Sequence, residues 1–219
     1  MRIPNLHLLP VLLLSCAMSL SGCASPKAVI PVSLLHNRIE ASPGGRGEII
    51  VVKPFIDSRK ESQRPYIGEI HEPVNMYPLP PVLIPVPSGR FIVEKNGANV
   101  AEILTGYFAE TLKGAGYKVL FSTLASLPPN AVFEGEVKEF WLTPSWTTKH
   151  VIRVRLKLYD KEGNRLLWEK EIRAQHSEFV GLWSSAAFEE LIKKALDNSL
   201  HQAAKEFASD EFQQKLREN

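Results

Sequence analysis

The sequence is poor in cysteine and has no marked excess of either charge. Its 219 residues include two cysteines, and 26 lysines and arginines stand against 24 acids, for a formal net charge of +2. Two thiols are too few for a disulfide-dense scaffold or a four-cysteine metal site. The charge balance argues against a strongly basic nucleic-acid-binding protein. An apolar content of 44% with so small a net charge excludes a wholly disordered chain.

The N-terminal apolar run is too short to cross a bilayer. Residues 8–20 carry no charge but span about 13 positions, whereas a membrane-spanning helix needs about 20. One basic residue, Arg2, precedes the run, and Leu20-Ser21-Gly22-Cys23 closes it. The layout is that of a secretory signal peptide, and its last four residues resemble the bacterial lipobox. We therefore predict a lipoprotein signal peptide over residues 1–22 and lipidation of Cys23.

Lipidation of Cys23 would leave the mature protein without a thiol. Removal of 22 residues from 219 leaves 197, takes away Cys16 and places a diacylglyceryl thioether on Cys23. The mature domain would then have no disulfide, no thiolate-bound metal and no thiol nucleophile. Two or more acyl chains, such as palmitate, hold a protein on a membrane stably. The alternative is an ordinary secreted protein in which Cys23 falls at this position by chance.

The residues after Cys23 bear on location and on the tether. In proteins with similar lipoboxes, Ala24 in place of Asp implies the outer membrane of a Gram-negative cell, with the domain facing the periplasm. Residues 23–47 are predicted to form the lipidated N-terminus and a tether, since the segment is rich in Pro, Ser and Gly. The apolar stretch 28–35 leaves a second arrangement open, in which part of this segment lies extended along the domain.

Residues 48–219 are predicted to form a single α+β domain. Apolar residues recur at helical spacing in two segments, and β-branched or alternating patterns mark the strands. The architecture that follows is a two-layer sandwich, with a mostly antiparallel sheet of about four to five strands and two helices packed on one face. The predicted strands are residues 48–55, 117–121, 132–141, 150–159 and 165–175, and the predicted helices are residues 99–114 and 184–207.

Two of these strands form a predicted hairpin around residues 160–164. A type I turn with Gly163 in the left-handed conformation would place Asp160 opposite Asn164. One face of the hairpin would then be buried and the other solvated, with complementary pairs on both. The predicted pairs are Leu156 with Trp168, Ile152 with Ile172, Arg155 with Glu169, and Arg153 with Glu171.

A proline-rich insertion is predicted over residues 60–98. Seven of the 16 prolines lie between positions 65 and 87, and proline both breaks helices and removes ladder donors. We expect neither a helix nor a central strand there, apart from one short strand at 91–93. Extended proline-rich segments lose little entropy on docking, so this insertion is the candidate partner-contact surface. Its candidate contact residues are Met76, Tyr77 and Leu79, together with the loop-edge aromatics Trp141 and Trp146.

No pattern of catalytic or metal-binding residues stands out. The histidines of the mature chain are not at ligand spacing, and Ser184 lacks a nucleophile-elbow motif. Asp57, Glu69 and Glu72 are acids near a strand end, where a carboxylate pair is conceivable but exposed loop acids are far commoner. We therefore expect no enzyme, no metal, no cofactor, no small-molecule substrate and no nucleic-acid partner.

Several short motifs resemble a lipoprotein family. After the lipobox come Phe55-Ile56-Asp57-Ser58-Arg59, then Ile67-Gly68, then Leu112-Lys113-Gly114-Ala115-Gly116-Tyr117, followed by long strands and a final helix. Over residues 48–207 this pattern resembles the YajG-type bacterial outer-membrane lipoproteins. It is also similar to the auxiliary lipoproteins of ABC-type transport systems and, more loosely, to LptE-like components.

The resemblance implies a non-enzymatic, lipid-anchored envelope lipoprotein. Such a protein would be a partner-binding or accessory component in outer-membrane assembly or transport, with an envelope protein as its partner. The alternative is a binding module for an envelope polymer such as peptidoglycan or lipopolysaccharide.

Overall fold

The computed structural model describes residues 27–30, 44–64, 66–70, 89–93, 99–121, 128–144, 147–179 and 185–218. Its strands are β1 (Lys27–Ile30), β2 (Ile49–Val52), β3 (Ile56–Asp57), β4 (Tyr66–Ile70), β5 (Gly89–Val93), β6 (Lys118–Phe121), β7 (Ala131–Thr143), β8 (Thr147–Tyr159) and β9 (Leu166–Phe179). Its helices are a 3₁₀ turn at Glu61–Gln63, α2 (Val100–Gly114), α3 (Ser185–Phe207) and α4 (Asp210–Arg217).

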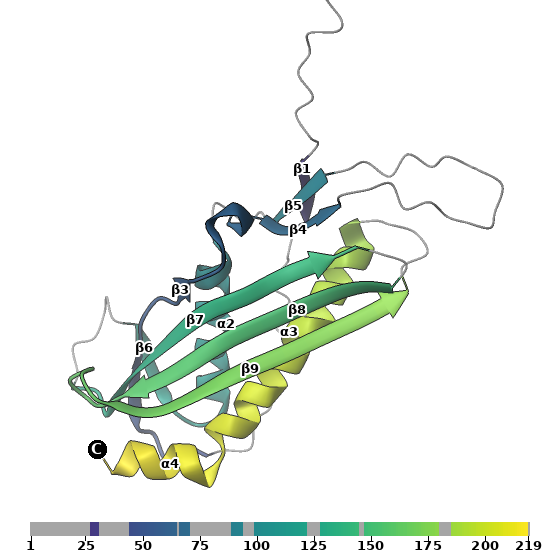
Figure 1. The fold of residues 1–219 in the computed structure, drawn as a ribbon. Coiled ribbons are helices and arrows are strands. Elements are labelled where there is room, and N and C mark those ends of the chain that lie inside the picture. The colour runs from purple at the N-terminus through teal and green to yellow at the C-terminus, as the bar shows by residue number, and fades with distance from the viewer. Residues whose placement is uncertain are drawn as a thin grey trace, which may run out of the picture.

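Strand β7 is the axis of the sheet. On one side it pairs with β8, which pairs in turn with β9, and these three long strands form an antiparallel ribbon. On its other side β2, β3 and β4 pair with it one after another, all parallel to it. Figure 1 shows β6 beyond β2, and β5 and β1 beyond β4.

The sheet is larger and more mixed than the sequence predicted. In the described part of the chain it has nine strands, several of them parallel, in place of four to five mostly antiparallel strands. Much of the difference comes from β4, for which no strand was expected, and from β1, where the alternative of an extended segment along the domain holds for Lys27–Ile30. The exclusion of a central strand from residues 60–98 is wrong for β4, because the residues between Pro65 and Pro73 contain no proline. Strand β4 lies between β5 and β7.

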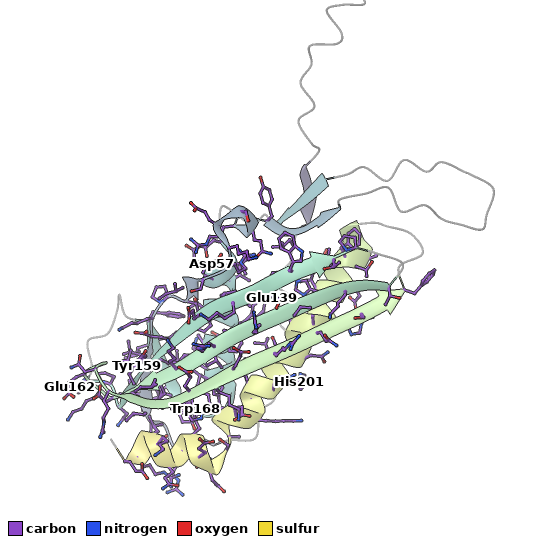
Figure 2. The ribbon with its side chains drawn as sticks, viewed as in Figure 1. Asp57, Glu139, Tyr159, Glu162, Trp168 and His201 are labelled. Carbon is purple, nitrogen blue, oxygen red and sulfur yellow. The ribbon has the colours of Figure 1, made fainter. Side chains whose placement is uncertain are left out.

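The β8–β9 hairpin keeps the predicted faces but not the predicted pairs. Gly163 has a positive φ of 76°, as expected, but Asp160 pairs with Arg165 rather than Asn164. A bulge then adds Leu167, because Tyr159 pairs with Leu166 while Leu158 pairs with Trp168. The register therefore slips by two residues, which preserves the inward and outward alternation. Figure 2 shows Tyr159, Glu162 and Trp168 near this turn.

The slip changes every predicted partner across the hairpin. Its consequence is largest for Arg153, which lies opposite another cation instead of the expected glutamate. The observed pairs are Leu158 with Trp168, Val154 with Ile172, Ile152 with Ala174, Lys157 with Glu169, Arg155 with Glu171, and Arg153 with Arg173.

Helices α2 and α3 pack against one face of the ribbon, as predicted. Asn99 accepts a hydrogen bond from the Glu102 backbone while the Glu102 side chain accepts one from the Asn99 backbone, so the predicted capping box is present. Helix α2 ends before Gly116, whose φ is 94°. Helix α3 covers β8 and β9 and also contacts α2, as Figure 1 shows.

The C-terminal tail forms a separate helix rather than an extension of α3. Ser209 caps α4 by accepting a hydrogen bond from the Phe212 backbone. The Phe212 ring packs against Tyr117, Trp168 and Phe207, with ring centroids 4.9–5.7 Å apart. The polar composition of the tail hid this helix, because only Phe212 and Leu216 are buried in it.

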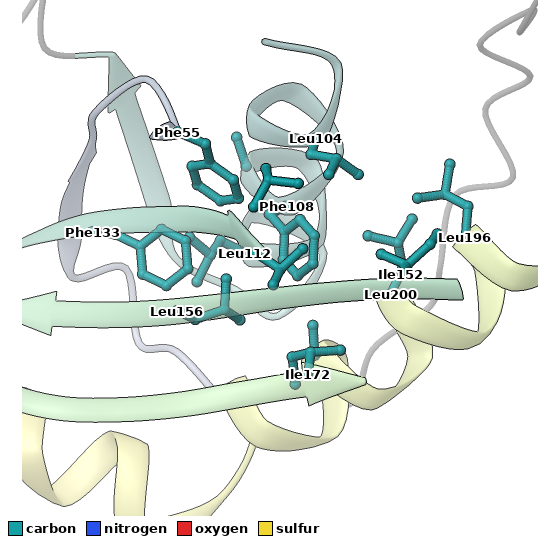
Figure 3. Close-up of a cluster of buried hydrophobic side chains, with 14 of the residues drawn as sticks. Phe55, Leu104, Phe108, Leu112, Phe133, Ile152, Leu156, Ile172, Leu196 and Leu200 are labelled. Carbon is teal, nitrogen blue, oxygen red and sulfur yellow. The ribbon is translucent and has the colours of Figure 1, made fainter. Parts of the chain in front are cut away.

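The core lies between the ribbon and the two helices. Its large buried side chains include Phe55, Leu104, Phe108, Phe133 and Leu156, which Figure 3 shows in one cluster. The Phe55 ring lies 5.6 Å from Phe108 and 6.1 Å from Phe133, centroid to centroid. It occupies the space over Gly135, where a side-chain Cβ would overlap the ring.

Gly135→Ala is therefore expected to destabilise the domain by about 1–3 kcal/mol through overpacking. Urea unfolding measures the change. The control is Gly106→Ala in α2, where nothing lies within 4 Å of the added Cβ and alanine favours the helix. In a Phe55→Leu background the cost of Gly135→Ala should shrink. Equal effects of the two glycine substitutions would contradict this account of the core.

Candidate functional site

The structure describes one of the residues predicted to have a function. Cys23, Met76, Tyr77, Leu79 and Trp146 lie outside the described residues. Trp141 lies in β7, half-buried, on the face of the ribbon away from the helices, directly opposite Val151. The predicted contact set therefore stays a prediction, because Trp141 is its one member among the described residues.

Two general features of the described residues bear on function. Among them no helix is long and apolar enough to cross a membrane. The same residues contain no group of three or more His, Cys, Asp or Glu side chains that could hold a metal ion.

An ion pair follows β3, within the Phe55–Arg59 motif. Arg59 is 3% exposed, and its side chain binds both carboxylate oxygens of Asp57, with Nε donating to Oδ1 at 2.9 Å and Nη2 to Oδ2 at 2.7 Å. Its Nη1 donates to the backbone oxygens of Tyr66 at 2.8 Å and Phe140 at 3.3 Å. One guanidinium thus joins β3, β4 and β7.

The electrostatics of this pair indicate a structural role. Partial burial on its own would raise the pKa of Asp57, but the hydrogen bonds and charge of Arg59 outweigh it and lower the pKa. A carboxylate held charged in a bidentate pair is poorly suited to act as a general base. Asp57 is therefore not part of a carboxylate pair, because the group that binds it is the Arg59 cation.

A buried histidine lies on the core face of β8. His150 is fully buried, packs edge-on against Phe140 with centroids 4.6 Å apart, and has no hydrogen bond at either ring nitrogen among the described residues. Burial lowers the pKa of His150 to about 3. Its cross-strand neighbour His176 binds Glu178, which also binds Lys194 on α3 at 2.7 Å.

The outer face of the ribbon, away from the helices, carries most of its charge. In the half nearer the β8–β9 turn, acids and bases alternate across the strands and neutralise one another. Arg155 lies 3.8 Å from Glu169 and 3.9 Å from Glu171, and Glu136 binds Lys138. The residues of this paired end are Glu134, Glu136, Arg155, Lys157, Glu169 and Glu171, with Lys53 and Lys138 bound to two of the glutamates.

The other half of the outer face has an excess of cations. Arg153 lies directly opposite Arg173, and the one acid close to it in the described part of the chain is Glu139, 3.7 Å from its Nε. That buried Nε has no hydrogen-bond partner among the described residues. We call Trp141, Lys149, Arg153 and Arg173 the cationic end; Figure 2 labels Glu139 beside it and Glu162 at the opposite turn.

Sequence reasoning found the basic residues of β8 but not this segregation of charge. The predicted register paired Arg153 with Glu171 and so made the whole outer face self-neutralising. The slip of two residues neutralises Arg155 and Lys157 and leaves Arg153 opposite Arg173. Only the four-residue turn and the Leu167 bulge distinguish the two registers, and neither has a strong sequence signal.

No family model matches the chain, and no curated protein matches it in sequence. Among solved structures, protein XCC0632 from Xanthomonas campestris, assigned to family DUF330, has a TM-score of 0.51 at 12% identity, covering 83% of this chain and 94% of its own. Lipoprotein GNA1162 from Neisseria meningitidis has a TM-score of 0.35 at 12% identity, with coverages of 71% and 99%. A PelC dodecamer from Paraburkholderia phytofirmans has a TM-score of 0.37 at 15% identity, covering 72% of this chain and 92% of its own.

The likeness to XCC0632 shows a shared α+β fold and nothing further, because the identity is so low. The other two scores fall below the level at which a fold comparison is informative. None of these names is that of a YajG-type or LptE-like protein, so that resemblance stays a prediction.

Removal of Arg59 should weaken the attachment of β3 and β4 to β7. Arg59→Ala leaves Asp57 without its partner, and the loss of one member of a buried pair costs about 3–5 kcal/mol. We expect roughly 2–4 kcal/mol in urea unfolding, because Asp57 keeps some contact with solvent. Arg59→Lys keeps the charge but not the forked geometry, so its loss should be intermediate. A loss below about 1 kcal/mol for Arg59→Ala would contradict this role.

His150 predicts a specific dependence of stability on pH. The unfolded chain binds a proton at this histidine below about pH 6.5, whereas the folded chain does not until about pH 3. The contribution of His150 to the free energy of unfolding is therefore complete above pH 6.5. It falls as pH drops, by about 2 kcal/mol between pH 7 and pH 5. In His150→Leu this contribution should vanish, while the exposed control His201→Gln should behave as wild type. If wild type and His150→Leu lost the same free energy of unfolding between pH 7 and pH 5, His150 would not be the cause of this pH dependence.

Proposed function

We propose that the protein is a non-enzymatic, lipid-anchored envelope lipoprotein, acylated at Cys23 and held at the outer membrane with its domain in the periplasm. There it acts as a partner-binding or accessory component in outer-membrane assembly or transport. The observation that carries this proposal is the sequence Leu20-Ser21-Gly22-Cys23 after a short uncharged run, followed by one α+β domain.

The described side chains support a binding role over a catalytic one. Asp57 is engaged by Arg59, and neither ring nitrogen of the buried His150 has a hydrogen bond to a described residue. The acids and bases of the paired end bind one another. What the domain offers instead is an outer sheet face with the exposed Arg173, two half-buried arginines and a half-buried tryptophan, residue types that are enriched where proteins bind partners.

The anchor is tested by Cys23→Ser in cells fed with labelled palmitate. Wild type should incorporate the label and leave the membrane fraction only with detergent, because a multiply acylated cysteine holds a protein on a bilayer stably. Cys23→Ser should lose the label entirely. Cys16→Ser is the matched control and should keep it, since this cysteine lies within the predicted signal peptide. Label retained on Cys23→Ser would overturn the proposal.

A further inference from the structure

We infer that the cationic end of the ribbon docks on a membrane surface that carries anionic lipid headgroups. The inference rests on the proposed lipid anchor at Cys23 and adds to it an orientation: the anchored domain meets the bilayer with one defined end. Several observations support this end and this occupant.

The first observation is the segregation of charge along the outer face. Among the residues that the structure describes, the cationic end has three bases, Lys149, Arg153 and Arg173, against the single acid Glu139, an excess of two positive charges. At the paired end, four glutamates are matched by Arg155, Lys157 and the two lysines bound to them. An anionic surface is therefore attracted to one end only, and each Lys or Arg near such a surface adds to the attraction.

The second observation is that the cations of this end are only partly paired with other described residues. Lys149 and Arg173 make no ion pair or hydrogen bond with any described residue, and Arg153 lacks a hydrogen bond at its buried Nε. Like charges directly opposite one another on a sheet are destabilising. A phosphate between two guanidinium groups offsets that repulsion and matches their forked donors.

Apolar side chains accompany the cations at the same end. Phe179, the last residue of β9, is 65% exposed and pairs with Thr147 at the start of β8. Trp141 lies half-buried on the outer face, and aromatic rings prefer the headgroup level of a bilayer. Glu178 does not cancel the positive charge, because it lies on the core face and binds Lys194 of α3.

The third observation is the direction of β1. Strand β1 is parallel to β5, β5 is antiparallel to β4, and β4 is parallel to β7, so β1 runs opposite to β7. Lys27 pairs with Arg90, which pairs with Glu69, the residue after the Gly68 that pairs with Leu142. The N-terminal end of β1 is thus level with the end of β7 that carries the cationic end.

Chain length then limits how far the anchor can lie from this end. Cys23 precedes Lys27 by four residues, which span at most about 14 Å. Three strand spacings separate β1 from β7, about another 14 Å. A lipid on Cys23 therefore holds the cationic end, and not the β8–β9 turn, close to the membrane, since β8 alone has 13 residues and is about 43 Å long.

The test uses the full chain expressed as a lipoprotein and reconstituted into vesicles. A single cysteine at the cationic end, Ser177→Cys, carries an environment-sensitive fluorophore, and Glu162→Cys at the β8–β9 turn is the matched control. Vesicles contain either equal parts of phosphatidylglycerol and phosphatidylcholine or phosphatidylcholine alone, with a spin-labelled lipid as quencher. In the anionic vesicles we expect the Ser177→Cys probe to be quenched at least about twofold more than the Glu162→Cys probe, and high salt to abolish the difference.

Paired substitutions separate this surface from bulk charge. Arg153→Gln with Arg173→Gln should reduce the docked population roughly tenfold, whereas Arg155→Gln with Lys157→Gln removes the same charge from β8–β9 and should leave it unchanged. Quenching at residue 177 that needs no phosphatidylglycerol, or that survives loss of Arg153 and Arg173, overturns the inference, because closeness to the bilayer then does not depend on these charges. A chain that floats with the vesicles but shows equal quenching at both probes overturns the inference and leaves the anchor standing. A chain that does not float overturns the anchor and the inference together.

Discussion

The structure depends on β7 having different neighbours along its two edges. One edge holds β8 in a long antiparallel ladder, and the other accepts the short strands β2, β3 and β4 in succession. This is possible because Phe55 turns inward over Gly135 between β2 and β3, where any larger residue would occupy the space of its ring. Arg59 then ties the segment after β3 to the Phe140 carbonyl of β7. The packing of Phe55 and the hydrogen bonds of Arg59 together hold β3 and β4 at this edge of β7.

The parts of the fold that the sequence predicts well are those with a strong local signal. The Asn99 capping box, the positive φ of Gly163 and the alternation in β7–β9 depend on neighbours in the chain, and the structure has all three. The pairing partners depend on loop length and bulges, which leave the alternation unchanged. A register shifted by two residues buries the same side chains, so hydrophobic pattern alone cannot detect the shift.

Other elements were missed because their signal is non-local. Strand β4 is apolar only in part and lies between prolines, so its pairing with β5 and β7 determines its conformation more than its own composition does. Helix α4 has two buried residues in eight, and it is held by the Tyr117, Trp168 and Phe207 rings from distant parts of the chain. The cationic end has the same origin. It exists because Arg153 and Arg173, 20 residues apart in sequence, become direct neighbours in the observed register.

In this account the core face of the ribbon packs on the helices, the outer face is proposed to bind, and the proposed lipid on Cys23 would determine which end of the ribbon lies near the membrane. The most direct measurement is mass spectrometry of the N-terminal peptide of the protein purified from membranes. The account predicts a mature chain that begins at Cys23 and carries the added mass of a diacylglyceryl group and at least one further acyl chain. A mature N-terminus at any other residue, or a peptide with an unmodified Cys23 thiol, would contradict it.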